Sequence, residues 1–352
     1  MTDMVLLVNG QEYSGWTSAR VTRGIEQICG AFELSVTERW ADQTVRGKIR
    51  LGDACALLMD GQTVVTGYVD DIEASYDAAS REVTIRGRDV TSDLVDCSVP
   101  TKPSEQTHEQ TLPVLAQRWC TPHGVTVQVA RGLDLSKKFR VEAGQESESV
   151  FERLERLARL RGVLLVSDGL GALEITRAST QRIPTRLVLG ENIMRGRGSF
   201  TQRDLYYRYT VKAQQQEADF PVQGTPSSSG TPSSSAIATD NSIRTNRGLT
   251  ILVEEPTDIV GCRDRANWEC NVRAGRGTRL NYTVQGWTYD GKTLWPINRL
   301  VQVVDDWLNV DKELLIVAVE YTLSADGTFT EITLCDPQAF NVLALSEKGA
   351  VF

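Results

Sequence analysis

The stretch with the clearest chemical pattern is residues 286–293, GWTYDGKT. It matches the phosphate-loop pattern G-x-x-x-x-G-K-[ST], in which backbone N–H groups and a lysine hold phosphate oxygens. Such a loop needs a strand before it, a helix after it and an open backbone nest. Here Asp290-Gly291 signals a hairpin turn, and Pro296 opposes a regular helix directly after the loop. The bulky Trp287 would also crowd a phosphate, so we interpret the stretch as a hairpin.

Histidine and cysteine positions offer no complete metal site. The histidines are His108 and His123, and Cys120 with His123 supplies only two ligands where a structural zinc site uses four. Cys262 and Cys270 are too far apart for a zinc knuckle. Seven cysteines without paired spacing fit reduced thiols in a cytosolic chain. We therefore expect no metal and no other cofactor.

Two pairs of adjacent carboxylates, Asp70-Asp71 and Asp305-Asp306, could be considered as a general acid and base. Adjacent residues on a strand point to opposite faces, so neither pair converges on one substrate. The sequence also lacks the G-x-S-x-G, H-E-x-x-H and dinucleotide-binding patterns. These observations predict that the chain is not an enzyme.

Composition fits a soluble protein of two or three domains. The chain has 352 residues, of which 41% are hydrophobic and 24% charged, close to globular averages. Its net charge of -8 argues against a nucleic-acid-binding surface, because phosphate affinity comes from Lys and Arg clusters. No apolar run is long enough to span a bilayer, and the N-terminus lacks the basic start of a signal peptide. We expect synthesis in the cytoplasm and no membrane insertion.

The most regular β pattern lies in residues 48–97. Asp60-Gly61 separates two β-rich runs and predicts a hairpin, because Gly accepts positive φ. With a helical turn at 90–95, residues 1–97 are expected to form a first β-barrel-like domain. Its predicted strands are residues 5–8, 15–23, 31–37, 54–59, 63–68, 69–75 and 81–87.

The pattern changes after residue 97. Apolar residues there recur at helical spacing, and Gly162 is placed as a helix C-cap. We expect residues 98–185 to form an α/β module inserted into the chain. Its predicted elements are helices at 107–120 and 147–161 and strands at 163–166 and 172–176.

The remainder returns to a β pattern. Residues 186–213 and 277–352 are expected to form a second β-barrel-like domain, on which a strand and helix from 249–276 pack. Residues 214–248 contain a repeated GTPSSS tract that cannot bury enough apolar surface to offset ordering entropy, so we predict a flexible loop. The fold class is thus β-rich α+β, with two related small β-barrel-like domains, an inserted α/β module and a helical and linker segment.

Two hairpins have similar sequences. Residues 319–336, VEYTLSADGTFTEITLCD, align with residues 72–89, IEASYDAASREVTIRGRD. Each reads as strand, turn, strand and Asp, followed by a short apolar helical turn. We interpret the pair as an internal duplication of one β unit.

Short segments carry a family resemblance: GWTS at 15–18, GAFEL at 30–34, VTGYVD at 65–70, GRDVTSDLVDC at 87–97, LGEN at 189–192, and GWT with LWP within 286–296. Over nearly its whole length the chain resembles the baseplate hub proteins of Mu-like contractile-tailed bacteriophages. The resemblance implies a virion protein of the tail baseplate, a homotrimeric pseudo-sixfold ring that joins the tail tube or tape-measure proteins to a membrane-piercing spike. It supplies no catalytic residue, and the tract at 224–235 departs from the family pattern as a loop insertion.

Seven positions of this chain are interpreted as structural, because they shape strands and turns instead of binding a ligand. They are Gly67, Asp70, Gly87, Asp89, Gly286, Trp287 and Trp295.

A trimer with two similar β units per chain presents six similar surfaces, which can match a threefold spike to a sixfold tube. The acidic net charge suits a channel through which DNA passes without specific binding. Two alternatives stay open. One is a carbohydrate- or peptidoglycan-binding protein that uses residues 98–185 and exposed aromatics such as Trp119; the other is an enzyme that depends on Asp70 or Lys292.

Overall fold

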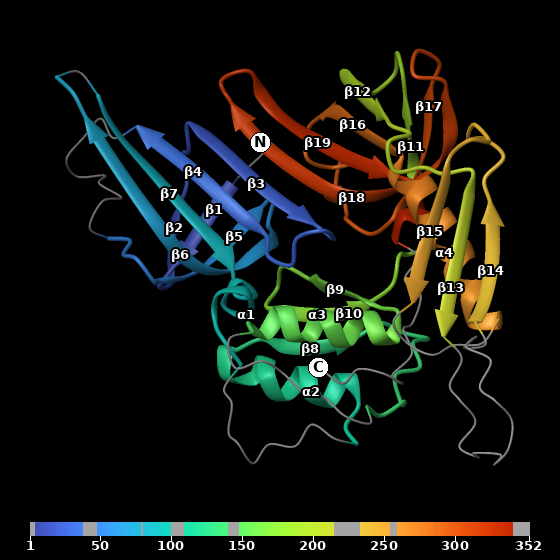
Figure 1. Ribbon diagram of the computed structural model, residues 1–352. Coiled ribbons are helices and arrows are strands. Elements are labelled where there is room, and N and C mark those ends of the chain that lie inside the picture. The colour runs from blue at the N-terminus through green and yellow to red at the C-terminus, as the bar shows by residue number, and fades with distance from the viewer. Residues whose placement is uncertain are drawn as a thin grey trace, which may run out of the picture.

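The protein is described here by a computed structural model, and its fold is β-rich α+β, as predicted. Figure 1 shows two β units next to each other above a small module of helices and strands, with a further strand layer and a long helix beside the second unit. The structure describes residues 4–37, 48–78, 80–99, 109–139, 148–214, 233–253 and 259–340.

The first β unit holds the predicted hairpin at Asp60-Gly61, where both residues have positive φ, 47° and 75°. The runs predicted as separate strands at 63–68 and 69–75 form one continuous strand, because a bulge near Asp70 bends the strand without ending it. The strands of this unit are β1 (Met4–Val8), β2 (Gln11–Tyr13), β3 (Ser18–Gly24), β4 (Ala31–Thr37), β5 (Ala54–Met59), β6 (Gln62–Tyr76) and β7 (Arg81–Asp89).

The second β unit continues the same sheet. Strand β3 pairs antiparallel with β18, from Ala19 opposite Leu323 to Gly24 opposite Ala318, so both units belong to one 13-stranded sheet. The strands of the second unit are β11 (Arg182–Val188), β12 (Arg195–Phe200), β16 (Thr278–Gln285), β17 (Leu300–Asp305), β18 (Val310–Ser324) and β19 (Gly327–Cys335), followed by the short helix η3 (Pro337–Phe340).

The similarity of the two hairpin sequences extends to strand pairing. Ile72 lies opposite Ile85 in the β6–β7 hairpin, and Val319 lies opposite Ile332 in the β18–β19 hairpin. These are the same relative positions in the sequence alignment of residues 72–89 with residues 319–336. The two hairpins therefore have the same register.

Both long strands also bulge at the same place. The register shifts between Val69 and Asp71 in β6 and between Ile316 and Ala318 in β18. Outward from the two hairpins, the neighbouring strands follow the same order: β5, β6, β7, β4, β3 in the first unit and β17, β18, β19, β16, β12 in the second. We conclude that each strand of one series has an equivalent in the other.

The inserted module has an α/β fold, as predicted. Helix α3 begins with a capping box, in which the Ser149 hydroxyl accepts from the Glu152 N–H and the Glu152 carboxylate accepts from the Ser149 N–H at 2.9 Å. It ends at Gly162, with φ 63°, as predicted. The elements are α1 (Ser92–Asp96), α2 (Leu112–Cys120), η2 (Thr121–His123), β8 (Thr126–Val129), α3 (Val150–Arg161), β9 (Leu164–Ser167) and β10 (Ala172–Thr176).

The predicted flexible loop at 214–248 is wrong for its second half. Residues 233–239 form a strand that pairs with the strand at 208–214, so the latter belongs to this small sheet and not to the second barrel-like domain that the sequence predicts for it. Burial of Tyr209 and Ala266 in one cluster explains the difference, because a helix covers this small sheet. Residues 215–232 lie outside the described residues. The elements are β13 (Arg208–Gln214), β14 (Ser233–Thr239), β15 (Gly248–Val253) and α4 (Ile259–Arg276).

We predict that Gly67→Ala lowers the free energy of unfolding by about 3 kcal/mol, because an added methyl group overpacks the β6–β7 contact. A Cβ at Gly67 would lie 1.9 Å from the Arg88 carbonyl oxygen. Urea unfolding monitored by circular dichroism measures the change. Gly248→Ala is the matched control, since no atom lies within 4 Å of its added Cβ; equal unfolding midpoints for the two variants would contradict the prediction.

Candidate functional site

The phosphate-loop pattern forms a turn that is closed by its own carboxylate. Asp290 accepts from the backbone N–H groups of Lys292 at 2.9 Å and Thr293 at 2.6 Å, and from the Thr293 hydroxyl at 2.9 Å. These backbone N–H groups hold the pKa of Asp290 below its usual value. The N–H groups that would surround a phosphate are therefore occupied by a negative charge. Residues 294–299 are also not helical, in agreement with the predicted hairpin.

The residues on either side of this turn belong to the core. Gly286 has φ 77°, which allows the chain to turn sharply after β16. The Trp287 side chain is 1% exposed, and its indole N–H donates to the Thr322 carbonyl at 3.0 Å. Trp295 is also buried, and its carbonyl accepts from the Tyr321 hydroxyl. These residues anchor the turn to β18, and Tyr321 is the anchor that sequence analysis did not identify.

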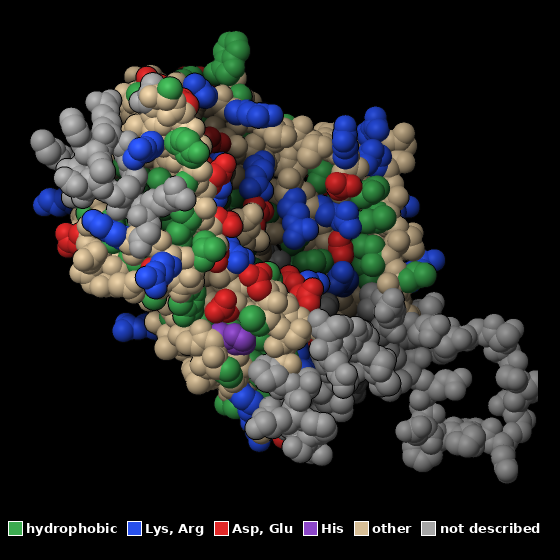
Figure 2. Space-filling model, turned by 90° about the vertical axis from the view of Figure 1, so that its left-hand side faces the viewer, with side chains coloured by type: hydrophobic (Ala, Val, Ile, Leu, Met, Phe, Trp, Pro, Cys, Tyr) green, Lys and Arg blue, Asp and Glu red, His purple; other side chains and the backbone are tan. Residues whose placement is uncertain are grey.

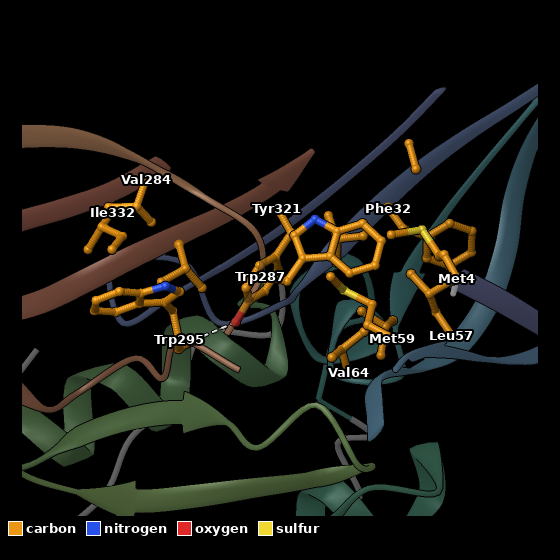
Figure 3. Close-up of a cluster of buried hydrophobic side chains, with 14 of the residues drawn as sticks. Met4, Phe32, Leu57, Met59, Val64, Val284, Trp287, Trp295, Tyr321 and Ile332 are labelled. Carbon is orange, nitrogen blue, oxygen red and sulfur yellow. Dashed lines mark hydrogen bonds between the residues drawn. The ribbon is translucent and has the colours of Figure 1, made fainter. Parts of the chain in front are cut away.

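The core around these tryptophans is shared by both β units. Figure 3 shows Trp287, Trp295 and Tyr321 of the second unit near Met59 and Phe32 of the first, with the Tyr321–Trp295 hydrogen bond drawn as a dashed line. All five belong to one cluster of buried side chains. The pairing of β3 with β18 is thus supported by a continuous hydrophobic core.

Asp89 joins the first β unit to the inserted module. Its carboxylate is buried and accepts from the Gly30 N–H at 2.5 Å, the Thr91 N–H at 2.9 Å and the Thr91 hydroxyl. Burial raises the pKa of Asp89, while these hydrogen bonds oppose the shift. The equivalent residue of the second unit, Asp336, accepts from the Gln338 N–H at 3.1 Å. Both aspartates therefore accept from the N–H two residues along, just before or at the start of the short helical turn, and only Asp89 is fully buried.

Asp70 and Gly87 have structural surroundings as well. Asp70, at the bulge, accepts from Arg88 Nε at 2.7 Å, and Arg88 also contacts Asp96 at 2.8 Å. A Cβ at Gly87 would lie 2.3 Å from the Tyr68 carbonyl oxygen and 2.5 Å from the Phe32 ring. Gly87 therefore permits close approach of β6 and packing of Phe32.

The other candidate chemical groups do not converge. Asp305 is buried and accepts from the Tyr282 hydroxyl at 2.9 Å, while Asp306 is exposed. His123 ends η2, and His108 lies outside the described residues. Within the described parts of the chain, no three His, Cys, Asp or Glu side chains are grouped to hold a metal ion.

Trp119 is buried, which contradicts its expected role as an exposed sugar-binding aromatic. Its side chain is 3% exposed and packs within the core of the inserted module. The Arg153 guanidinium lies 4.6 Å above the ring and closes that face. Helical periodicity of α2 could have indicated this burial, because Leu112, Leu115 and Trp119 lie on one face.

A polar groove of about 850 Å³ crosses the β3–β18 junction. Four of the five arginines that line it are ion-paired: Arg20 with Glu320 at 2.7 Å, Arg279 with Glu26 at 2.6 Å, Arg88 with Asp70 at 2.7 Å and Arg86 with Glu33 at 2.6 Å. The fifth, Arg23, donates to the Asp168 carbonyl at 2.7 Å. Figure 2 likewise shows acidic and basic side chains interspersed on one side of the molecule. The groove therefore does not present a positive patch of the kind that binds nucleic acid.

Family models match three stretches of the chain. Residues 3–89 match the N-terminal part of the Mu phage baseplate assembly protein GpP-like family. Residues 91–177 match the second domain of the baseplate hub protein gp44-like family. Residues 259–343 match the fourth domain of the Mu phage baseplate assembly protein GpP.

Relatives match over the full length. Baseplate hub protein gp44 of Escherichia phage Mu is 31% identical over 349 residues, which cover 98% of this chain and 90% of that protein. The crystal structure of the 43 kDa tail protein of prophage MuSo2 from Shewanella oneidensis has a TM-score of 0.84 and 35% identity, and covers 97% of this chain and 100% of that one. The tail protein from Neisseria meningitidis MC58 has a TM-score of 0.79 at 20% identity, with 97% and 98% covered, and shares the fold.

We predict that Asp89→Ala lowers the free energy of unfolding by about 3 kcal/mol, because the buried N–H groups of Gly30 and Thr91 lose their acceptor. Chemical denaturation at neutral pH measures the loss. The control is Asp336→Ala, which removes the equivalent but partly exposed carboxylate and should cost less than about 1 kcal/mol. A loss as large at Asp336 as at Asp89 would contradict the role assigned to burial.

A second prediction concerns nucleotides. Titration of the wild-type chain with a fluorescent ATP analogue and Mg²⁺ should show no saturable binding, because Asp290 fills the turn. Lys292→Ala should behave identically and unfold at the same denaturant concentration. Saturable binding that disappears in Lys292→Ala would overturn the hairpin interpretation.

Proposed function

This chain belongs to the baseplate hub protein family of Mu-like phages, and from that premise we propose that three copies form a ring that joins the tail tube to the spike. The family places the chain in the tail baseplate of a virion. In the proposed ring the chain has a structural role without catalysis. DNA passes through the ring without specific binding.

The observation that carries this proposal is the internal duplication. The equivalent strand series, the shared hairpin register and the shared bulge give each chain two similar β units in one sheet. Three chains would then place six similar units around one axis. Such a ring can match a spike of threefold symmetry on one side and a tube of sixfold symmetry on the other.

The groove surface is our candidate for the wall of the channel. Four of its five arginines are paired with carboxylates, as in the Arg20–Glu320 and Arg279–Glu26 contacts, and the net charge of the chain is -8. A surface without excess positive charge adsorbs a passing polyanion weakly. This supports passage of DNA without retention.

The alternative of a carbohydrate- or peptidoglycan-binding protein has less support. It depended on exposed aromatics in the inserted module, and Trp119 is buried. A structural role is also favoured over an enzyme, because Asp70 is bound to Arg88 and the Lys292 turn is closed by Asp290. Among the described helices, none has the length and apolar character that a membrane span requires.

We predict that the purified full-length chain has a mass three times its chain mass of 38.9 kDa. The head-to-tail contacts of a closed ring hold three copies together. Size-exclusion chromatography with multi-angle light scattering, run over a series of micromolar concentrations, measures this. A mass that stays at one chain throughout the series would refute the proposed ring.

A further inference from the structure

We infer that neighbouring copies join by adding the outer edge of β12 to the free edge of β6, which makes the contact between chains a copy of the β3–β18 contact within each chain. This inference rests on the proposed ring and specifies its interface. The partner is a second copy of the same chain. Figure 1 shows the outer end of β6 at the upper left and β12 at the top right of centre, so the two edges are well separated within one chain, as a head-to-tail contact requires.

The long strand β18 supplies the template for this contact. Its first half, from Val310 to Leu315, pairs with β17, and its second half, from Ala318 to Leu323, pairs with β3. On the equivalent edge of β6, only the first half of the strand has a partner. Gln62 to Tyr68 pair with β5, whereas residues 71–76 pair with β7 alone among the described strands. Residues 71–76 are therefore equivalent to the segment of β18 that pairs with β3, but they have no strand partner on that edge among the described residues.

Strand β12 is the equivalent of β3, and the registers align them residue by residue. Arg197 lies opposite Asn281 of β16, as Arg20 lies opposite Glu33 of β4. The residue just before each strand also makes an equivalent backbone hydrogen bond to the neighbouring strand. Met194 N–H donates to the Thr283 carbonyl at 2.9 Å, and Thr17 N–H donates to the Ser35 carbonyl at 2.8 Å. One edge of β3 is covered by β18, but the corresponding edge of β12 has no strand partner within the described residues.

The backbone groups of both free edges point outward at the required positions. In β12, Thr201 N–H donates to the Gly277 carbonyl at 2.9 Å, and every second residue before it also directs its N–H toward β16. The residues between them, Gly196, Gly198 and Phe200, therefore direct their N–H groups outward.

In β6, Asp77 N–H donates to the Ser80 carbonyl at 2.9 Å, and every second residue before it directs its N–H toward β7. The residues between them, Ile72, Ala74 and Tyr76, therefore direct their N–H groups outward. Carrying over the β3–β18 register puts each of the three β12 residues opposite one of these: Gly196 with Tyr76, Gly198 with Ala74 and Phe200 with Ile72.

The side chains on the polar face agree with this register. Within the chain, Arg20 of β3 contacts Glu320 of β18 at 2.7 Å. The equivalent residues are Arg197 of β12 and Glu73 of β6, which are both exposed and of opposite charge. The interface therefore repeats an ion pair that the chain already makes at its internal junction.

The side chains on the opposite face are exposed aromatics. Phe200 is 56% exposed and Tyr76 is 82% exposed, although both lie on strands. Leu323, the equivalent of Tyr76, packs against the shared core. In the proposed contact Tyr76 lies opposite Gly196, whose lack of a side chain accommodates the Tyr282 ring of β16. A long free edge with exposed aromatics is a pairing surface, and a second copy covers it.

Disulfide trapping tests the register. Ser199→Cys with Glu73→Cys places cysteines at positions equivalent to Thr22 and Glu320, a non-hydrogen-bonded pair about 4.5 Å apart at Cα, within disulfide reach. Mild oxidation should convert the full-length double variant to covalent dimers and closed trimers on a denaturing gel. The control is Ser199→Cys with Ser75→Cys, a diagonal pair about 7–8 Å apart, which should remain monomeric. The single variants Ser199→Cys and Glu73→Cys, oxidised in the same way, show whether a native cysteine forms crosslinks with an introduced one.

A proline variant tests the same edge without cysteines. Ala74→Pro removes an outward N–H and keeps every pairing to β7, so the isolated chain should fold while the trimer is lost. Glu12→Pro is the matched control on the exposed edge strand β2. The two-residue hairpin pairs Val8 with Gln11, so the Glu12 N–H also points outward, and trimers should persist.

The outcomes separate the inference from the proposed function. A wild-type trimer that persists in Ala74→Pro and shows no Ser199–Glu73 crosslink overturns the interface and leaves the ring intact. A wild-type chain that remains monomeric overturns both. Circular dichroism of Ala74→Pro confirms folding, so a lost trimer with an unchanged spectrum supports the interface.

Discussion

The antiparallel pairing of β3 with β18 is the contact on which the arrangement of the whole chain depends. It joins two β units into one sheet, and residues from both units meet in one core around Trp287, Tyr321 and Met59. Burying this many apolar side chains across one junction makes separate movement of the units costly. The relative orientation of the two units within a chain is therefore fixed, and any ring built from such chains inherits that orientation.

Several residues whose sequence pattern suggests a binding or catalytic role instead stabilise this arrangement. Asp290 closes the turn whose sequence resembles a phosphate loop, and that turn is anchored to β18 by Trp287. Asp89 is buried where the first unit meets the inserted module, and its equivalent Asp336 likewise accepts from the N–H two residues along, in a more exposed place. The aspartate thus has the same backbone role in both units although its surroundings differ. In the same way β12 has an edge like that of β3 although its sequence is rich in glycine.

Local features of the fold can be predicted from the sequence, because hairpin turns, helix caps and alternation are set by neighbouring residues. The Asp60-Gly61 turn, the Gly162 cap and the duplicated hairpins are examples. Long-range pairing cannot be predicted in the same way. Strand β14 lies in a Ser-rich tract that carries no strand pattern of its own. It is stabilised by pairing with β13 and by packing against α4, and not by its own side chains. Trp119 was misjudged for a related reason, since its burial depends on Arg153 of another helix.

We propose that one type of strand junction, used once within the chain, is used again between chains to close a ring. A cryo-electron microscopy reconstruction of the assembled full-length protein tests this most directly. We expect a closed ring of three chains in which β12 of each copy pairs with β6 of the next, and in which that junction superposes on the β3–β18 junction. A ring held together through the inserted module or through α4, with the edges of β12 and β6 exposed to solvent, would contradict it.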